Sequence, residues 1–101
     1  MVEDEKFEKD SNVVYVGNKP PMNYVTAVLA IINSDQYKEV MLKARGNAIS
    51  KAVDVAEITR NRFATYAQIK SIEIGTESLN REDGKSSNVS SIEICLTAKK
   101  Q

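Results

Sequence analysis

The feature that most constrains the fold is a junction where an apolar run gives way to a helical pattern. Residues 38–44 contain an apolar run of strand length, and Gly46 and Asn47 follow as a turn residue and a residue type that caps helices. The next apolar residues recur at three- and four-residue spacing, which predicts one buried helix face made of Ile49, Ala52, Val53, Ala56 and Phe63. The junction therefore predicts a strand, a tight turn and a helix at 48–63.

Cations gather at this junction, namely Lys43, Arg45 and Lys51. The free backbone N–H groups of a helix N-terminus favour anions, so cations around it predict a phosphate-binding surface. A plain solvated edge would carry the same three charges, and the pattern alone does not separate the two interpretations.

The rest of the chain supplies one further strand and helix before the junction and two strands after it. The predicted strands are 12–16, 38–44, 68–77 and 88–99, and the predicted helices are 20–33 and 48–63. The element order is therefore βαβαββ. Residues 1–11 are charged and lack periodicity, so we expect a disordered acidic tail followed by one domain, 12–101.

The last two strands alternate apolar and polar residues, which predicts a hairpin with one half-buried face. Ile72 and Ile74 carry this pattern in the third strand, and Ile92, Ile94 and Leu96 carry it in the fourth. Their polar connection, 79–88, contains the turn pair Asp83-Gly84 flanked by two cations, Arg81 and Lys85. A β-ribbon has a width suited to a nucleic-acid groove. A plain solvated hairpin tip would have the same sequence pattern, so both interpretations stay open.

Composition excludes several functional classes. The formal net charge of the 101 residues is zero, but residues 1–10 carry five acidic and two basic side chains, a net charge of −3, which leaves +3 for the rest. With no histidine and one cysteine, Cys95, the chain lacks a Ser-His or Cys-His catalytic pair, the usual zinc ligand sets and an internal disulfide. We expect no enzyme activity, no cofactor or metal, no membrane partner and a reducing, cytoplasmic setting. An enzymatic alternative would have to use carboxylates such as Asp54 and Glu57, which look like solvated charges on a helix face.

Several segments together resemble the Alba family of archaeal chromatin proteins. They are Asn12-Val13-Val14, 17–25, Lys43-Ala44-Arg45-Gly46, 48–54, Arg60-Asn61-Arg62-Phe63 and 89–94. The resemblance implies a two-layer α/β sandwich, in which two helices pack on a four-stranded mixed sheet and the last two strands form an extended hairpin arm. It also implies a homodimeric, chromosome-associated architectural protein that binds double-stranded DNA. An RNA-binding protein acting in RNA maturation or stability remains the alternative.

The resemblance also assigns roles to residues. Phosphate contacts from the dimer body fall on Lys19, Lys43 and Arg45, with Lys51 beside them, and the arm residues Arg81 and Lys85 would lie along the minor groove. Asn23 and Tyr24 match the family motif, although Tyr24 fits a core aromatic as well as a nucleic-acid contact. Contacts between neighbouring dimers fall on Arg62 and Phe63, and Phe63 could instead close the end of its helix.

Two positions in the expected footprint depart from the family pattern. Asn18 stands where the family has a lysine, the one associated with acetylation, and Asn47 stands where a basic residue is common. Non-specific affinity depends mainly on the number of neutralised phosphates. The sequence therefore predicts nucleic-acid binding that is weaker than in relatives with the full basic set, and no control by acetylation at residue 18.

Overall fold

The computed structural model describes residues 11–97, and its elements follow the predicted βαβαββ order. The strands and longer helices are β1 (Val13–Tyr15), α1 (Pro21–Ile32), β2 (Glu39–Arg45), α2 (Ile49–Ile58), β3 (Gln68–Asn80) and β4 (Ser86–Thr97). A 3₁₀ turn, η1 (Gly46–Ala48), precedes α2, and a π-helical turn, η2 (Thr59–Phe63), continues it. The sheet order is β1-β2-β4-β3, with β1 and β2 parallel and the other two pairs antiparallel. The predicted four-stranded mixed sheet is confirmed.

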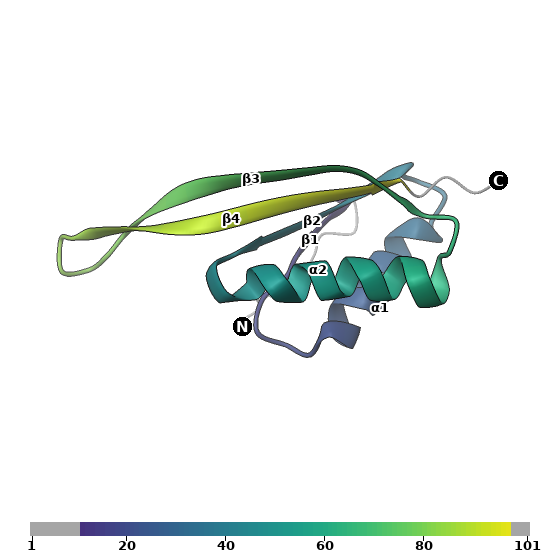
Figure 1. Cartoon of the computed structure of the whole chain (residues 1–101), viewed down its shortest axis with the longest axis horizontal. Helices are drawn as coiled ribbons and strands as arrows, with labels where there is room; N and C mark the ends of the chain where they lie inside the picture. Colours follow the sequence, from purple (N-terminus) through teal and green to yellow (C-terminus); the bar gives the residue numbers. More distant parts are fainter. Residues whose placement is uncertain (1–10, 98–101) are drawn as a thin grey trace.

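The fold has two layers, because α1 and α2 both lie on one side of the sheet (Figure 1). The core between the layers is built from fully buried aliphatic side chains: Val25, Val28 and Ile32 of α1, Val40 and Leu42 of β2, Ala52 and Val55 of α2, and Ile94 and Leu96 of β4. Burying one such larger side chain contributes roughly 1.5–3 kcal/mol. This shared core fixes the position of the loops that follow β1 and β2.

Local chemistry explains where α1 begins and ends. Pro21 occupies the first helical position, where a missing N–H costs nothing, and Pro20 stands before it in an extended conformation. At the other end the Ser34 hydroxyl donates a 2.8 Å hydrogen bond to the carbonyl of Ile31. The observed helix is one residue shorter at each end than the predicted range.

The buried face of α2 differs from the predicted one at three positions: Val55 is buried although it was not predicted to be, and Val53 and Phe63 are exposed although they were predicted to be buried. Ala52, Val55 and Ala56 are buried, whereas Val53, which lies about 100° around the helix from Ala52, is 43% exposed. Phe63 is 49% exposed, and the next residue, Ala64, is buried in its place. The reason is the π turn, in which the N–H of Ala64 donates to the carbonyl of Thr59 at 2.8 Å across five residues instead of four. The prediction that Phe63 belongs to the buried face was wrong.

The β3–β4 ribbon reaches farther toward its turn than the sequence predicted, and residues 98–99 of the predicted last strand lie outside the described residues. Pairing runs from Gln68 opposite Thr97 to Asn80 opposite Ser86, so the predicted loop 79–88 shrinks to residues 81–85. Strand pairing needs only backbone groups, and the side-chain alternation disappears where both faces meet solvent. The turn carries Gly84 at φ 84°, and the Asp83 carboxylate accepts a hydrogen bond from the Lys85 N–H at 3.0 Å. The ribbon extends past the end of α2, and the longest dimension of the molecule is 51 Å (Figure 1).

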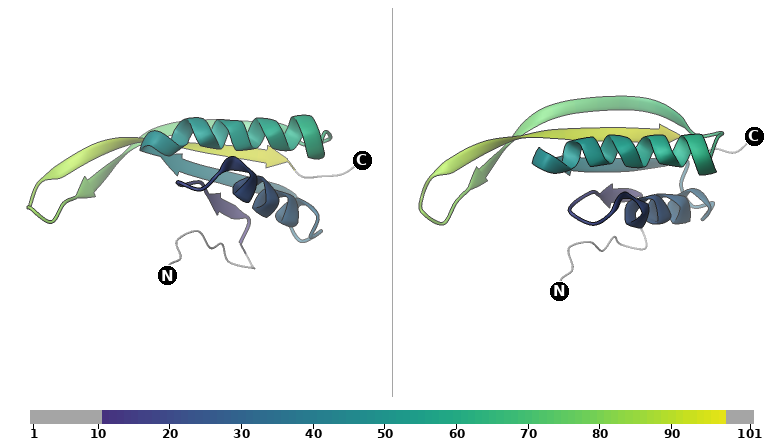
Figure 2. Two further views of the ribbon diagram at one scale, coloured as in Figure 1. Left: turned by 90° about the horizontal axis from the view of Figure 1, so that it is seen from below. Right: turned by 60° about the horizontal axis from the view of Figure 1, so that its bottom comes forward.

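Two apolar residues of β3 remain exposed in the single chain. Ile72 and Ile74 lie opposite Ile94 and Ile92 and so share the helix-facing side of the sheet. They are nevertheless 54% and 82% exposed, because β3 is the edge strand and arches away from α2 (Figure 2). The predicted burial is confirmed for β4, where Ile92, Ile94 and Leu96 are buried, whereas the single chain leaves Ile72 and Ile74 of β3 exposed.

The first described residue belongs to the range predicted as a tail. The Ser11 hydroxyl accepts a 3.1 Å hydrogen bond from the N–H of Val13, and residues 1–10 of the predicted tail lie outside the described residues. Within 11–97, no helix combines the length and the apolar character needed to cross a membrane.

Candidate nucleic-acid interface

A hollow of about 710 Å³ lies where the loops after β1 and β2 meet the middle of β4. Six of the predicted contact residues line it: Asn18, Lys19, Tyr24, Lys43, Arg45 and Asn47. These residues come from three separate segments, and the parallel pairing of β1 with β2 brings the ends of both strands to one edge of the sheet. The structure therefore gathers most of the predicted dimer-body footprint into one surface.

The loop after β1 is held in place from two sides. Tyr24 is 5% exposed, and its hydroxyl accepts a 3.0 Å hydrogen bond from the backbone N–H of Lys19. From α2, the Lys51 ammonium donates a 2.7 Å hydrogen bond to the carbonyl of Lys19. Gly17 fits closely here, since a Cβ at this position would lie 3.4 Å from the Tyr24 hydroxyl. Tyr24 is thus a core aromatic whose polar end fixes the loop that carries Asn18 and Lys19.

The two cations of β2 each face a carboxylate from another strand. The Lys43 ammonium lies 3.5 Å from the Glu93 carboxylate of β4, and the Arg45 guanidinium donates a 2.9 Å hydrogen bond to the Glu77 carboxylate of β3. Both carboxylates also line the hollow. Neither carboxylate was predicted as part of the site, because each is far along the chain from the cation that it faces. Only the strand alternation, which places Glu93 on the polar face of β4, hinted at one of them.

The start of α2 differs from the simple capped helix that was predicted. Asn47 lies in the 3₁₀ turn η1, the N-cap residue is Ala48, and no side chain caps the helix. The prediction that Asn47 caps α2 was wrong, because η1 takes the place of the expected first turn. The side chain of Asn47 is exposed and lines the hollow instead.

The remaining predicted residues lie outside the hollow. Asn23 is exposed on the first turn of α1. Arg81 and Lys85 are exposed at the two ends of the hairpin turn, where the Arg81 guanidinium is 3.8 Å from the Asp83 carboxylate. Arg62 and Phe63 are exposed in η2, at the opposite end of α2 from the hollow. Because Phe63 is exposed, its side chain does not pack into the core at the end of the helix.

Comparison with known proteins decides the family. The sequence model of the Alba family matches residues 12–76. The chain belongs to the Alba family. The predicted family and fold are both confirmed.

Three of the proteins that the chain resembles come from archaea. The chain is 56% identical over 85 residues to the DNA/RNA-binding protein Alba of Methanococcus maripaludis, covering 84% of this chain and 96% of that one. It is 57% identical over 88 residues to DNA/RNA-binding protein Alba 1 of Archaeoglobus fulgidus, covering 87% and 97%. The solved structure of Alba from Thermoplasma volcanium superimposes with a TM-score of 0.78 at 53% identity, covering 84% of this chain and 98% of that one. The names of the first two relatives describe nucleic-acid binding and indicate no catalytic activity.

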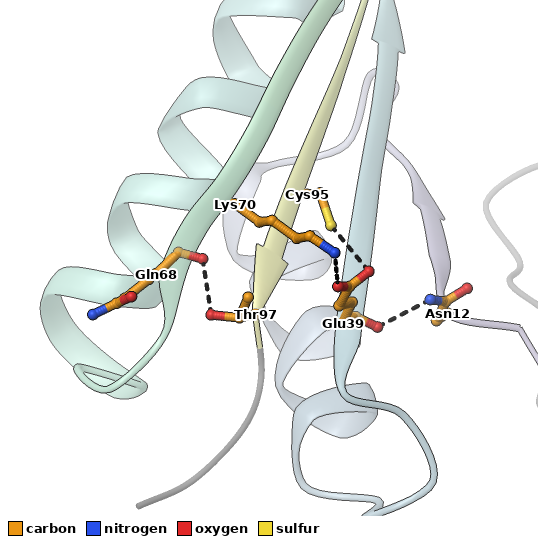
Figure 3. A network of polar contacts seen from close by, with 6 residues as sticks. All are labelled: Asn12, Glu39, Gln68, Lys70, Cys95 and Thr97. Carbon is orange, nitrogen blue, oxygen red and sulfur yellow. Dashed lines mark hydrogen bonds and ion pairs between the residues drawn. The ribbon is translucent and has the colours of Figure 1, made fainter.

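A polar cluster stands at the other end of the Alba-family sheet, where β2 begins and β4 ends (Figure 3). The Lys70 ammonium donates a hydrogen bond to the Glu39 carboxylate. The same carboxylate accepts a 3.5 Å hydrogen bond from the Cys95 thiol. The hydrogen bond from Lys70 lowers the pKa of Glu39. Burial, together with Glu39, raises the pKa of the Cys95 thiol. The side-chain amide of Asn12 donates to the Glu39 carbonyl at 3.0 Å, which ties β1 to β2.

This cluster has the chemistry of a structural contact. A thiol with a raised pKa is a poor nucleophile, because the thiolate is the reactive form. Among residues 11–97, no group of three or more potential ligands could hold a metal ion. Of the carboxylates considered for an enzyme, Glu57 bonds to the Arg60 guanidinium at 2.8 Å within the same helical segment. The Glu39 cluster and the Glu57–Arg60 pair are therefore best explained as contacts that stabilise the fold.

Proposed function

We propose that this Alba-family chain binds double-stranded DNA as a homodimeric architectural protein associated with the chromosome in the cytoplasm. The observation that carries the proposal is the hollow, which gathers Lys19, Lys43 and Arg45 beside the backbone of two loops. Clustered cations and exposed backbone N–H groups are the usual partners of phosphate oxygens. The names of the archaeal relatives, which describe DNA and RNA binding, support the same function.

In the proposed complex the hollow faces the phosphate backbone and the arm reaches into a groove. A two-stranded ribbon matches groove dimensions, and Arg81 and Lys85 place a cation at each end of its turn. Asn23 would lie on the flank of the contact, and Lys51 would act by holding the loop of Lys19. Arg62 and Phe63, at the far end of α2, would meet the next dimer along the DNA.

The exposed apolar residues of β3 support self-association. Ile72 and Ile74 form an apolar strip on the helix-facing side of the edge strand, and such a strip is costly to leave in water. We expect a homodimer in which a second copy covers this strip. Light scattering at micromolar protein should give the mass of two chains, and Ile74→Asp should shift the mass toward one chain. A monomeric wild-type protein would refute the dimer.

We also propose that binding is weaker than in relatives with a fully basic first loop. Asn18 and Asn47 add no positive charge to the hollow, and the residues after the first ten carry a net charge of only +3. Each phosphate that is left without a cation lowers both the affinity and its dependence on salt.

A competition experiment tests the proposed function. The full-length protein is titrated with a short mixed-sequence duplex DNA and with a structured RNA hairpin of similar charge, at about 50 and about 200 mM salt. Tighter, salt-dependent binding to the duplex supports a DNA-organising protein. Preference for the hairpin favours the alternative, an RNA-binding protein acting in RNA maturation or stability, which the names of the relatives also include. Absence of binding to either probe would overturn both.

A further inference from the structure

We propose that Glu77 and Glu93 compete with nucleic-acid phosphates for Arg45 and Lys43, and so set the affinity of the hollow. This inference rests on the proposed function, because it assumes that the hollow receives phosphates. Glu77 and Glu93 lower the net positive charge of the hollow, which the number of its basic residues alone does not show.

The contacts place a carboxylate beside each cation of β2. The guanidinium of Arg45 and the carboxylate of Glu77 are 2.9 Å apart, within hydrogen-bond distance. The ammonium of Lys43 and the carboxylate of Glu93 are 3.5 Å apart. All four side chains line the hollow. A phosphate that contacts either cation must therefore displace a carboxylate or accept one as a close neighbour.

The register of the sheet, rather than chance side-chain placement, brings these groups together. Lys43 and Glu93 are direct partners on β2 and β4. Arg45 is the partner of Ser91, and Ser91 is also the partner of Gly75 on β3. Glu77 lies two residues beyond Gly75, so its side chain emerges on the same face of the sheet and reaches back toward Arg45. The long edge strand β3 thus supplies a carboxylate to a surface formed by the loops after β1 and β2.

The strength of these pairs makes exchange with phosphate feasible. All four side chains are partly exposed, with 36% to 57% of the side-chain surface accessible. Exposed ion pairs of this kind contribute up to about a fivefold change in an equilibrium constant, which a ligand can overcome. The displaced carboxylate stays in the hollow, however, and its charge opposes the approaching phosphate. The effective cation count of the hollow is therefore lower than the three cations Lys19, Lys43 and Arg45 suggest.

The test removes the charge of Glu77 and keeps its shape. Glu77→Gln should raise the affinity for the duplex DNA by up to about fivefold per chain. It should also steepen the plot of log K against log salt by up to about 0.9 per chain. Glu93→Gln should act in the same direction. The matched control is Asp54→Asn, which removes an equal charge from an exposed carboxylate of α2 that does not line the hollow and makes no ion pair with another described residue. Thermal unfolding of each variant confirms that the fold is kept.

The outcomes separate this inference from the proposed function. If Glu77→Gln binds more tightly than Asp54→Asn, direct competition for Arg45 is supported. If the two variants gain equally, only long-range charge is involved and the inference fails while DNA binding stands. If Glu77→Gln binds more weakly than the wild type, Glu77 orients Arg45 toward phosphate, and the inference fails as well. If neither the wild type nor any variant binds, the proposed function falls and the inference falls with it.

Discussion

Replacing Asn18 by lysine should strengthen nucleic-acid binding and make it more sensitive to salt. Asn18 is exposed and lines the hollow beside Lys19. The loop that carries it is held by the Tyr24 hydroxyl and the Lys51 ammonium, so a new lysine would project from a fixed backbone. Each added phosphate contact steepens the slope of log K against log salt by about 0.9 on duplex DNA. A dimer with both sites engaged should change by nearly two.

The measurement is a salt titration of duplex binding, followed by fluorescence anisotropy, with the wild type and two variants. Gln36→Lys serves as the control, because Gln36 is exposed in the turn between α1 and β2 and does not line the hollow. Asn18→Lys should exceed Gln36→Lys in both affinity and slope. Equal effects would mean that only net charge matters, and an unchanged Asn18→Lys would mean that the first loop faces away from the nucleic acid.

Three further expectations follow from particular contacts. Tyr24→Phe removes the acceptor for the Lys19 N–H, so the free energy of unfolding in urea should fall by about 0.5–1.5 kcal/mol. Binding to duplex DNA should weaken while the slope of log K against log salt stays the same. A changed slope would contradict the role of Tyr24 in positioning the loop. Replacing both Arg81 and Lys85 by Glu should weaken duplex binding strongly and leave the melting temperature nearly unchanged, because both side chains are exposed in the turn. Unchanged affinity would mean that the arm does not contact the DNA. Glu39→Gln should lower the melting temperature in full above the ordinary glutamate pKa of 4.5, since the pKa of Glu39 is lowered in the folded chain. The stability that the Glu39 carboxylate adds is lost as the pH falls from that value through the lowered pKa of the folded chain, so a wild-type advantage that persists in strong acid would contradict the ion pair.

The sequence predicted elements well where one face of an element is buried. The alternation of Ile92, Ile94 and Leu96 was a reliable sign because each of these side chains enters the core. The same pattern at Ile72 and Ile74 failed for the single chain, because alternation shows which face a residue occupies and not whether a helix covers that face. The outer ribbon, exposed on both sides, had no side-chain pattern to read, and its length could not be predicted.

The candidate site was predicted in its cations and missed in its counter-charges. Lys43 and Arg45 stood out because they lie beside a turn, which is a local feature of the sequence. Glu77 and Glu93 become their neighbours only through the register of β2, β4 and β3, and a register depends on the whole sheet. The burial of Ala64 in place of Phe63 could not be predicted either, because a π turn leaves no clear mark in the spacing of apolar residues.

The β3–β4 ribbon joins two environments along one continuous hydrogen-bonded ladder. Near Leu96 the strand is anchored by buried side chains, whereas near Ser86 it lies beyond α2 and has no apolar cover (Figure 1). The free energy of local opening should therefore fall steadily along β4, from that of global unfolding to nearly zero at the turn. Amide hydrogen exchange would then quicken from Leu96 toward Ser86. The outer ladder can fray and re-form while the core stays closed, so the tip can adjust to a surface without any loss of the folded domain.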